Sequence, residues 1–345
     1  MTDLQGRDLE IGLIGAGGIA QSYVKVVEAL DGVRLTAVAD PRGRAAGTVA
    51  DAVCGTAYPS HRALLEEADV DAVLVCSPPS THPEIVLQAI ERGLHVLCEK
   101  PLAIDVESAS KMVEAAERVG VTFTMAAKFR FVDDVIRARQ IVGSGILGEL
   151  MVLENAFASR VDMSRRWNAD PAISGGGVLI DNGTHSVDIV RYFLGPIAEV
   201  MAVEGKRVQH LPVEDTASML LRTPDGVLAT VDLSWSVDRV TDTYLTLYGS
   251  EGTVSVGWNG ARYRQASSPE WVTFGSGYDK LTCMGAQVAN FCAAVRGDEK
   301  LAVTADDAIG SVAVIEAAYA ALERNDWIAV RDLPGGAAAA GAQVA

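Results

Sequence analysis

The sequence predicts an α/β protein with two unlike parts, a doubly wound parallel sheet followed by an α+β domain with a large, mostly antiparallel sheet. Short apolar segments alternate with helix-length amphipathic segments through the first 127 residues, whereas strand-like segments follow one another directly from Ile197 to about Phe274. A chain of 345 residues suffices for two domains with cores of their own. We therefore expect domains at 1–127 and 128–333 and a disordered tail at 334–345.

The strands expected in the first domain are short apolar runs of the kind that is buried on both faces. In chain order they are IGLIG (11–15), VRLTAVAD (33–40), DAVLVCS (71–77), LHVLCEK (94–100) and VTFTMAA (121–127). Helical segments lie between them. One should begin at His82 after PPST, and another should be capped by Asp105 and end at Gly120. Short connections between strand, helix and strand imply right-handed crossovers and a parallel sheet.

The second part of the chain has a different pattern. A helical segment (133–143) and a strand (150–159) are followed by an irregular stretch and a helix over 177–194. Alternating strands separated by turns come next and predict an antiparallel sheet with one covered face. Two helices, 280–296 and 305–324, close this domain.

Composition argues against several classes of partner. The formal net charge of -16 repels phosphate, so we expect neither nucleic acid nor a membrane as a partner. The same acidic balance would suit a cationic substrate. We find no signal peptide and no apolar segment of membrane-spanning length. The five cysteines show no CxxC spacing, so we expect small buried side chains in a reducing cytoplasm, without disulfides or a metal site.

The motif GAGGIA, residues 15–20, follows the first strand and opens a helix. Gly15 permits a tight turn, and Gly17 lets the backbone approach a pyrophosphate. The helix start at Gly18 and Ile19 then offers free N–H groups to the phosphates. Such turns also occur without a ligand, so it is the strand before the motif and the helix after it that favour a dinucleotide.

Asp40 ends the second strand, 20 residues after Ala20, where its carboxylate can accept both hydroxyls of an adenosine ribose. This favours NAD over NADP, because a 2′-phosphate would meet a negative charge. Arg42 and Arg44 leave NADP open, since an arginine just beyond the strand could pair with that phosphate. The alternative is a surface aspartate that starts a turn.

Two further strand ends should face the same ligand, because ligands of such sheets lie outside the carboxyl ends of the strands. SPPSTH places Ser77 and Pro78 beside the cofactor, with His82 as a capping or supporting residue. EKP places Glu99 and Lys100 at the next strand end, where the lysine could reach a substrate oxygen. A solvated lysine is the alternative.

The stretch SGGGVLIDNGTH (174–185) sets three glycines before an aspartate and a histidine. In a helix over 177–194, Asp181 and His185 share a face with Asp188, a pattern that suits a pocket wall. The glycines would leave room for a ligand and could expose N–H groups to it. Taken alone, the stretch fits a capped helix with a satisfied histidine.

GAGGIA, VAD, SPPSTH, RGLHVLCEKP and GGGVLIDNGTHSVD, in this order and spacing, resemble the Gfo/Idh/MocA family from about residue 9 to 330. The resemblance implies a Rossmann domain, a C-terminal domain whose open sheet often forms oligomer contacts, and NAD(P)-dependent chemistry on sugars, cyclitols or related polyols. Lys100, Asp181 and His185 match the family's active-site lysine, aspartate and histidine. SPPSTH and RRWN (165–168) depart from the family's pattern near the cofactor.

With this resemblance, the residues predict a dehydrogenase or ketoreductase acting on a ring hydroxyl of a sugar, aminosugar or cyclitol. His185 would serve as acid and base, because the ordinary imidazole pKa of about 6.5 allows proton exchange at cellular pH. Lys100 would stabilise the alkoxide. Asp181 would orient the substrate or hold His185.

Further substrate contacts are expected from two segments. Lys128 and Arg130 follow the last strand of the first domain and should line the cleft between the domains. The irregular stretch that should cap the substrate contains Asp162, Arg165, Arg166 and Trp167.

Two other functions remain open from the sequence. One is an oxidoreductase that keeps its cofactor bound and recycles it. The other is a cofactor-binding regulator without turnover, which would be expected to lose Lys100 or His185. We also expect a homodimer or homotetramer formed through the C-terminal sheet.

Overall fold

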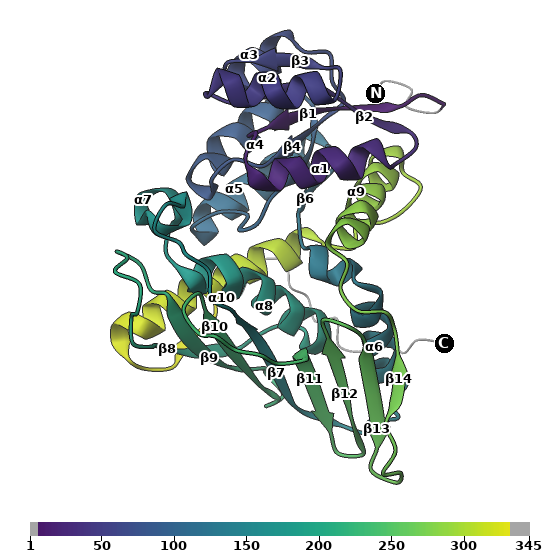
Figure 1. Ribbon diagram of the computed structural model, residues 1–345, viewed down its shortest axis with the longest axis vertical. Helices are drawn as coiled ribbons and strands as arrows, with labels where there is room; N and C mark the ends of the chain where they lie inside the picture. The colour runs from purple at the N-terminus through teal and green to yellow at the C-terminus, as the bar shows by residue number, and fades with distance from the viewer. Residues whose placement is uncertain (1–5, 332–345) are drawn as a thin grey trace.

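The computed structural model describes residues 6–331, and the expected disordered tail at 334–345 lies outside them. Two sheets organise the molecule, one in an N-terminal domain and a larger one in a C-terminal domain (Figure 1). The first is wholly parallel and the second mostly antiparallel, so the predicted fold class is confirmed.

The N-terminal sheet has six strands in the order β3-β2-β1-β4-β5-β6. They are β1 (Leu9–Ile14), β2 (Val33–Ala39), β3 (Thr56–Tyr58), β4 (Ala72–Val75), β5 (His95–Cys98) and β6 (Phe123–Met125). The connecting helices are α1 (Gly18–Glu28), α2 (Gly43–Ala52), α3 (His61–Glu67), η1 (Pro79–Thr81), α4 (His82–Glu91) and α5 (Val106–Val119). Because the strand order reverses between β1 and β4, the carboxyl ends of these strands flank the crevice where such sheets bind ligands.

Local chemistry sets the ends of α5 as the sequence predicts. The Asp105 side chain accepts a hydrogen bond of 2.7 Å from the N–H of Ser108 at the helix start. Gly120 ends the helix with a φ of 79°, a left-handed conformation that glycine adopts without strain.

The C-terminal sheet has nine strands in the order β14-β13-β12-β11-β7-β10-β9-β8-β15. They are β7 (Leu150–Ala158), β8 (Glu199–Glu204), β9 (Thr216–Arg222), β10 (Leu228–Ser234), β11 (Thr243–Gly249), β12 (Gly252–Gly257), β13 (Ala261–Gln265), β14 (Val272–Phe274) and β15 (Ile328–Ala329). Only β7 and β10 pair in parallel among the described strands of this sheet. This follows because β7 lies between two antiparallel groups of successive strands, β8–β10 and β11–β14.

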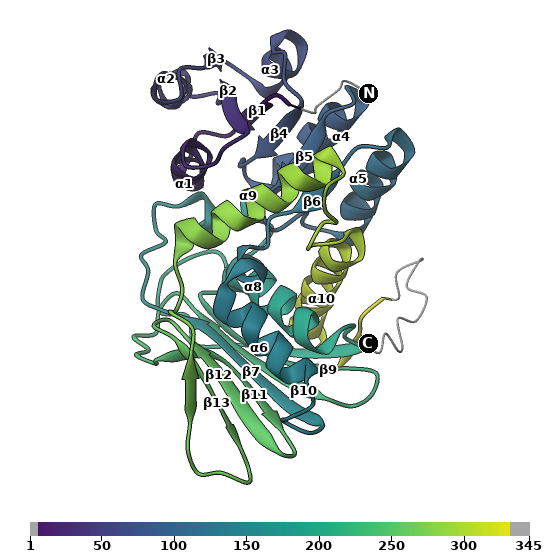
Figure 2. The same cartoon turned by 90° about the vertical axis from the view of Figure 1, so that its right-hand side faces the viewer.

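Helices cover one face of this sheet. α8 (Val178–Leu194) and α10 (Ala305–Arg324) lie between the sheet and the N-terminal domain, and α6 (Asp133–Gly143) packs on β12 (Figure 2). Shorter helical segments are η2 (Lys128–Phe131), η3 (Trp167–Ala169) and α7 (Pro171–Ser174). Alternate residues on the other face remain exposed, among them Val203, Leu228 and Tyr248.

Helix α9 (Lys280–Arg296) departs from the expected division of the chain after residue 127. It packs on α1, and Met284, Val288 and Phe291 are buried in the same apolar cluster as strands β1 and β2. The N-terminal domain is therefore completed by a helix that the sequence assigned to the second domain. The amphipathic pattern of α9 predicts a buried face but does not identify the surface that buries it.

The five cysteines are all free. Cys98, Cys283 and Cys292 are buried, and Cys76 is partly buried. Cys54 is exposed, so the expectation that all five are buried is wrong for Cys54. Between residues 6 and 331 no helix combines the length and apolar character needed to cross a bilayer. Nor does this part of the chain gather three His, Cys, Asp or Glu side chains into a group able to hold a metal ion.

Candidate active site

A cavity of about 580 Å³ lies between the two domains. Its N-terminal wall comes from the start of α1 and from the ends of β4, β5 and β6, and its C-terminal wall comes from α8 and the stretch before η3. The predicted site residues that line it are Gly17, Gly18, Ile19, Ser77, Glu99, Lys100, Lys128, Trp167, Asp181 and His185. The remaining lining residues are Cys76, Ala126, Arg165, Arg166, Asn168 and Gln287.

The glycine turn before α1 is open toward this cavity. Gly15 has a φ of +99°, and a Cβ there would lie 2.7 Å from the carbonyl carbon of Cys76, so the turn requires glycine. A Cβ at Gly17 or Gly18 would meet no atom within 4 Å, and no side chain caps the helix. The first N–H groups of α1 and the positive end of its dipole are thus free for an anion.

Asp40 follows β2 and is buried. Its carboxylate accepts hydrogen bonds from the N–H of Ala16 at 2.8 Å and from Arg42 Nε at 2.9 Å. Burial opposes ionisation, but the hydrogen bonds from Arg42 and from backbone N–H groups bring the pKa of Asp40 below its ordinary value. An ionised carboxylate therefore stands at the strand end where a ribose is expected.

Lys100 follows β5 and reaches across the cavity to α8. Its Nζ lies 2.6 Å from Asp181 Oδ1 and also donates to the Asp181 carbonyl oxygen at 3.0 Å. The peptide bond between Lys100 and Pro101 is cis. This ion pair joins two residues that are 81 positions apart and connects the two domains.

His185 lies one turn after Asp181 on α8, edge-on to the ring of Phe129 with the centroids 5.2 Å apart. Burial lowers the pKa of His185 well below its ordinary value, and the charges of Lys100 and Lys128 lower it further. The imidazole is therefore neutral at neutral pH. Asp181 bonds to Lys100, and within residues 6–331 it makes no hydrogen bond to His185, so the expected holding of His185 by Asp181 is not seen.

The glycines before α8 face protein. The Gly177 N–H donates to Glu214 Oε1 at 3.0 Å and to Tyr319 Oη at 3.2 Å. Glu214 Oε1 also accepts the Leu179 N–H at 3.0 Å. A Cβ at Gly176 would lie 1.9 Å from Tyr319 Oη, and one at Gly177 would lie 2.1 Å from the Glu214 carbonyl oxygen. The prediction that these glycines make room for a ligand and expose N–H groups to it is therefore wrong.

Comparison with known proteins agrees with this geometry. Residues 9–127 match the model of an oxidoreductase family with an NAD-binding Rossmann fold, and residues 135–255 match the GFO/IDH/MocA C-terminal domain. The rhizopine catabolism protein MocA of Rhizobium meliloti is 30% identical over 334 residues, which are 91% of this chain and 95% of that protein. The chain belongs to the Gfo/Idh/MocA family of oxidoreductases. Inositol 2-dehydrogenase 2 of Saccharopolyspora erythraea is also 30% identical, over 72% of this chain and 73% of its own.

Solved structures show the same architecture. GenD2 from gentamicin A biosynthesis, crystallised with NAD, superposes with a TM-score of 0.85 at 25% identity over 94% of this chain and 97% of its own. Levoglucosan dehydrogenase, crystallised with NADH and levoglucosan, superposes with a TM-score of 0.88 over 95% of this chain and 100% of its own. At 19% identity, the second likeness is one of fold.

The N-terminal domain of this Gfo/Idh/MocA protein is the family's NAD-binding Rossmann fold, and its residues fit that cofactor. The open space beyond Gly17 and Gly18 suits a pyrophosphate at the start of α1. Asp40 does not line the cavity, but its carboxylate stands at the end of β2, where the adenosine ribose of a bound dinucleotide would lie. Ser77 and Glu99 line the cavity at the ends of β4 and β5, where the nicotinamide end of a dinucleotide would lie.

Seven residues predicted to contact ligands in this Gfo/Idh/MocA chain do not line the cavity, namely Gly15, Asp40, Arg42, Pro78, His82, Arg130 and Asp162. His82 is buried, with Nδ1 3.0 Å from the Pro101 carbonyl oxygen and Nε2 2.8 Å from that of Ser77. It braces the two strand-end loops against each other, as its supporting role predicts. Pro78 is also absent from the lining, and Asp162 is exposed with its side chain bonded to the backbone of its own loop.

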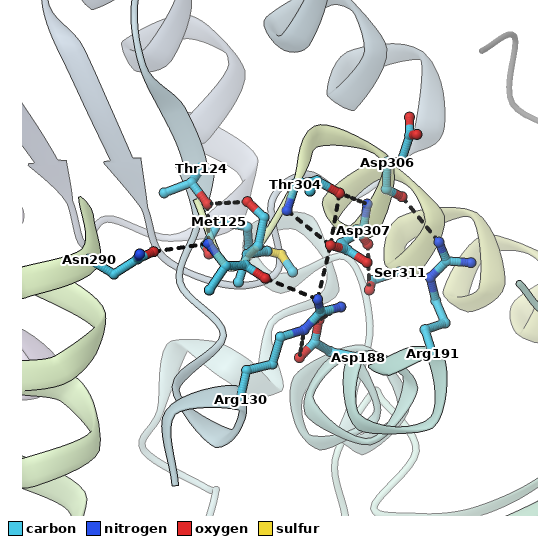
Figure 3. A network of polar contacts seen from close by, with 12 residues as sticks. Thr124, Met125, Arg130, Asp188, Arg191, Asn290, Thr304, Asp306, Asp307 and Ser311 are labelled. Carbon is cyan, nitrogen blue, oxygen red and sulfur yellow. Dashed lines mark hydrogen bonds and ion pairs between the residues drawn. The ribbon is translucent and has the colours of Figure 1, made fainter. Parts of the chain in front are cut away.

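Arg130 is not among the residues that line the cavity. It is bonded to Asp188 and Asp307 instead (Figure 3). Its Nε donates to Asp188 Oδ1 at 2.9 Å, and its Nη1 lies 2.9 Å from Asp307 Oδ2. The predicted substrate contact of Arg130 is therefore wrong, because the guanidinium is buried where η2, α8 and α10 meet. Asp188 shares the face of Asp181, but seven residues advance a helix by about 10 Å, which places it beyond the cavity.

Three cavity residues that lie outside the predicted site segments were missed in the sequence, Cys76, Ala126 and Gln287. Cys76 could have been found, since it stands one residue before Ser77 at a ligand-facing strand end. No pattern in the sequence pointed to Gln287, because it lies on α9, a helix that the sequence did not place beside the cofactor domain. Its Nε2 donates to Tyr23 Oη at 2.9 Å, and Tyr23 in turn donates to Glu99 Oε1 at 2.7 Å. α9 thereby supports the strand end that precedes the candidate catalytic lysine.

Proposed function

We propose that the chain is an NAD-dependent dehydrogenase or ketoreductase that transfers a hydride between nicotinamide and a ring secondary alcohol of a sugar or cyclitol. The observation that carries the proposal is the meeting of Lys100, Asp181 and His185 at the cavity that also receives the open start of α1. The relative named inositol 2-dehydrogenase 2 supports a cyclitol or sugar as the substrate class.

The chemistry assigns one task to each group. Oxidising a secondary alcohol removes a hydride from carbon and a proton from oxygen, and bound NAD supplies the hydride acceptor. Neutral His185 takes the hydroxyl proton. Lys100, held by Asp181, donates a hydrogen bond to the same oxygen and stabilises its growing negative charge. In ketone reduction, His185 returns the proton and Lys100 polarises the carbonyl.

The aminosugar that the acidic composition suggested is left out of this proposal. The charged side chains lining the cavity are Lys100, Lys128, Arg165 and Arg166 on the basic side and Glu99 and Asp181 on the acidic side. Basic groups are thus in excess where the substrate would bind, although the whole chain carries a formal net charge of -16. Charge over the whole surface says little about one cavity.

Two finer expectations stay predictions. Copies of the chain would associate through the face of the large sheet that exposes Val203, Leu228 and Tyr248. Location in the cytoplasm is supported by the free state of all five cysteines, as expected in a reducing compartment.

The test is turnover by single variants on a panel of sugars and cyclitols, followed as NADH absorbance. His185→Ala and Lys100→Ala should each lower kcat by about 100-fold to 10,000-fold, the usual contribution of one acid–base group. Both should still bind NAD. His210→Ala, an exposed histidine, is the matched control and should turn over normally. A wild-type rate in either active-site variant would refute the assignment.

A further inference from the structure

Lys128 is the first residue of η2 and follows β6, the last strand of the N-terminal sheet. It lines the cavity together with Lys100 and His185. Its Nζ stands 5.5 Å from the ring centroid of Phe129 and 6.0 Å from that of Tyr278. Throughout residues 6–331 the structure gives this ammonium no hydrogen-bond acceptor and no ion-pair partner.

Lys128 is partly buried, and its ammonium has lost part of its hydration without gaining an acceptor among the described residues. Burial lowers the pKa of Lys128; the charge of Glu99 opposes this, while Lys100 and Lys280 lower it further. The aromatic rings offset only part of the lost hydration. The nearby carboxylates are engaged elsewhere, since Asp181 pairs with Lys100 and Glu99 accepts from Tyr23. A ligand is therefore the natural source of the missing negative charge.

We propose that Lys128 binds a carboxylate of the substrate, so that the preferred substrate is a sugar acid or cyclitol acid rather than a neutral or amino-substituted polyol. The inference rests on the proposed function, because that function places the reacting alcohol beside Lys100 and His185. Oxidised nicotinamide brings a further positive charge to the cavity, which a substrate carboxylate offsets.

A carboxylate fits this position better than a phosphate. Phosphate sites combine several donors, usually an arginine fork or the N–H groups at a helix start. At α8 those N–H groups are taken by Glu214, and at α1 they serve the cofactor. The cavity also holds Arg165 and Arg166, which are the side chains that a phosphate would use. Lys128 itself offers one compact cation, which matches one carboxylate.

The experiment compares matched sugars on the protein saturated with NADH, with binding read from the fluorescence of bound NADH. The pairs are glucose with glucuronate and galactose with galacturonate, and glucosamine and glucose 6-phosphate complete the panel. At least one acid should bind about tenfold or more tightly than its neutral partner, as expected for a charge-assisted hydrogen bond. High salt should reduce this ratio.

Variants locate the effect. Lys128→Met should bring the ratio of acid to neutral affinity close to one, and Lys128→Arg should keep most of the preference. Lys111→Met removes the same charge from an exposed pair with Glu107 on α5 and should leave the ratio as in the wild type. NADH binding by each variant reports that the fold is intact.

The outcomes separate the two proposals. A preference that survives Lys128→Met, stronger binding of glucosamine or of glucose 6-phosphate, or no binding of either acid overturns the inference about Lys128. Turnover of neutral sugars with NAD and no preference for acids overturns it while leaving the proposed function standing. Selective binding of an acid without NAD reduction on any sugar or cyclitol overturns the proposed function instead.

Discussion

Two helices of this protein begin after glycines, and the glycines do opposite things. Before α1, a Cβ at Gly17 meets no atom within 4 Å and no side chain caps the helix, so the space and the N–H groups are left for a ligand. Before α8, a Cβ at Gly177 would lie 2.1 Å from the Glu214 carbonyl oxygen, and Glu214 and Tyr319 accept the N–H of Gly177. The turn before α1 is open and leaves its N–H groups for a ligand, whereas the turn before α8 is closed because its N–H groups bond to side chains of the same protein.

The difference shows what a glycine run cannot reveal by itself. Both runs precede a helix whose start carries functional residues, but Glu214 lies 37 positions from Gly177 and Tyr319 lies 142 positions away. Those partners fix α8, and with it Asp181 and His185, against the rest of the domain. The closed turn before α8 holds the side of the cavity that carries Asp181 and His185 in place. The open turn before α1 leaves space for the proposed cofactor contact.

The largest effect is expected at the closed turn. Gly177→Ala forces a methyl group against the Glu214 backbone and should lower the free energy of unfolding by about 3 kcal/mol, the upper range for overpacking. Urea denaturation measures this. Gly43→Ala, at the start of α2 with no atom within 4 Å of the added Cβ, is the matched control and should change little. Equal stability of the two variants would contradict the close packing of Gly177 against Glu214.

The opposite result is expected at the open turn. Gly17 has a φ of -83°, so alanine is tolerated there, but its methyl group occupies space that the pyrophosphate needs. Gly17→Ala should weaken NAD binding about tenfold, or about 1.4 kcal/mol, and leave unfolding without NAD unchanged. Calorimetric titration and urea denaturation of one preparation give both numbers. Unchanged NAD affinity would remove this turn from the cofactor site.

A smaller, pH-dependent effect is expected at Glu214, which caps α8. Burial is the main cause that raises the pKa of Glu214 above its ordinary 4.5, although hydrogen bonds oppose it. Wild-type stability should therefore be favoured below about pH 4.5 and decline as the pH rises through the folded-state pKa. Glu214→Gln lacks this decline, so its stability relative to wild type should improve as the pH rises over that interval. Glu117→Gln, an exposed glutamate, should show no such trend.

The smallest effect concerns a residue outside both turns. The proposed mechanism needs neutral His185, so kcat/KM should fall as the pH drops through a pKa that lies below the ordinary 6.5. Lys128→Met removes one cause of that lowering and should move the acid limb of the pH profile to higher pH, measured with a neutral polyol. Lys111→Met is the control for loss of one charge. A limb that stays in place would show that Lys128 does not act on His185.

Features that depend on residues close together in the sequence could be predicted, and features that depend on distant residues could not. The strand periods, the cap of α5 and the tight turn at Gly15 depend on neighbours in the chain, and they were predicted. The shared site of Lys100 and Asp181 followed from a family resemblance, but the ion pair between them was not predicted. The burial of Arg130 and the placement of α9 depend on partners far along the chain, and local patterns carry no information about those partners.

The placement of α9 has a consequence for protein synthesis. A ribosome that has made every strand of the N-terminal sheet has still to translate about half of the chain before α9 emerges. Until then, the apolar surface of α1 that later contacts Met284, Val288 and Phe291 is exposed on the nascent chain. The cofactor domain therefore matures after translation of residue 296, when the other domain has nearly finished leaving the ribosome.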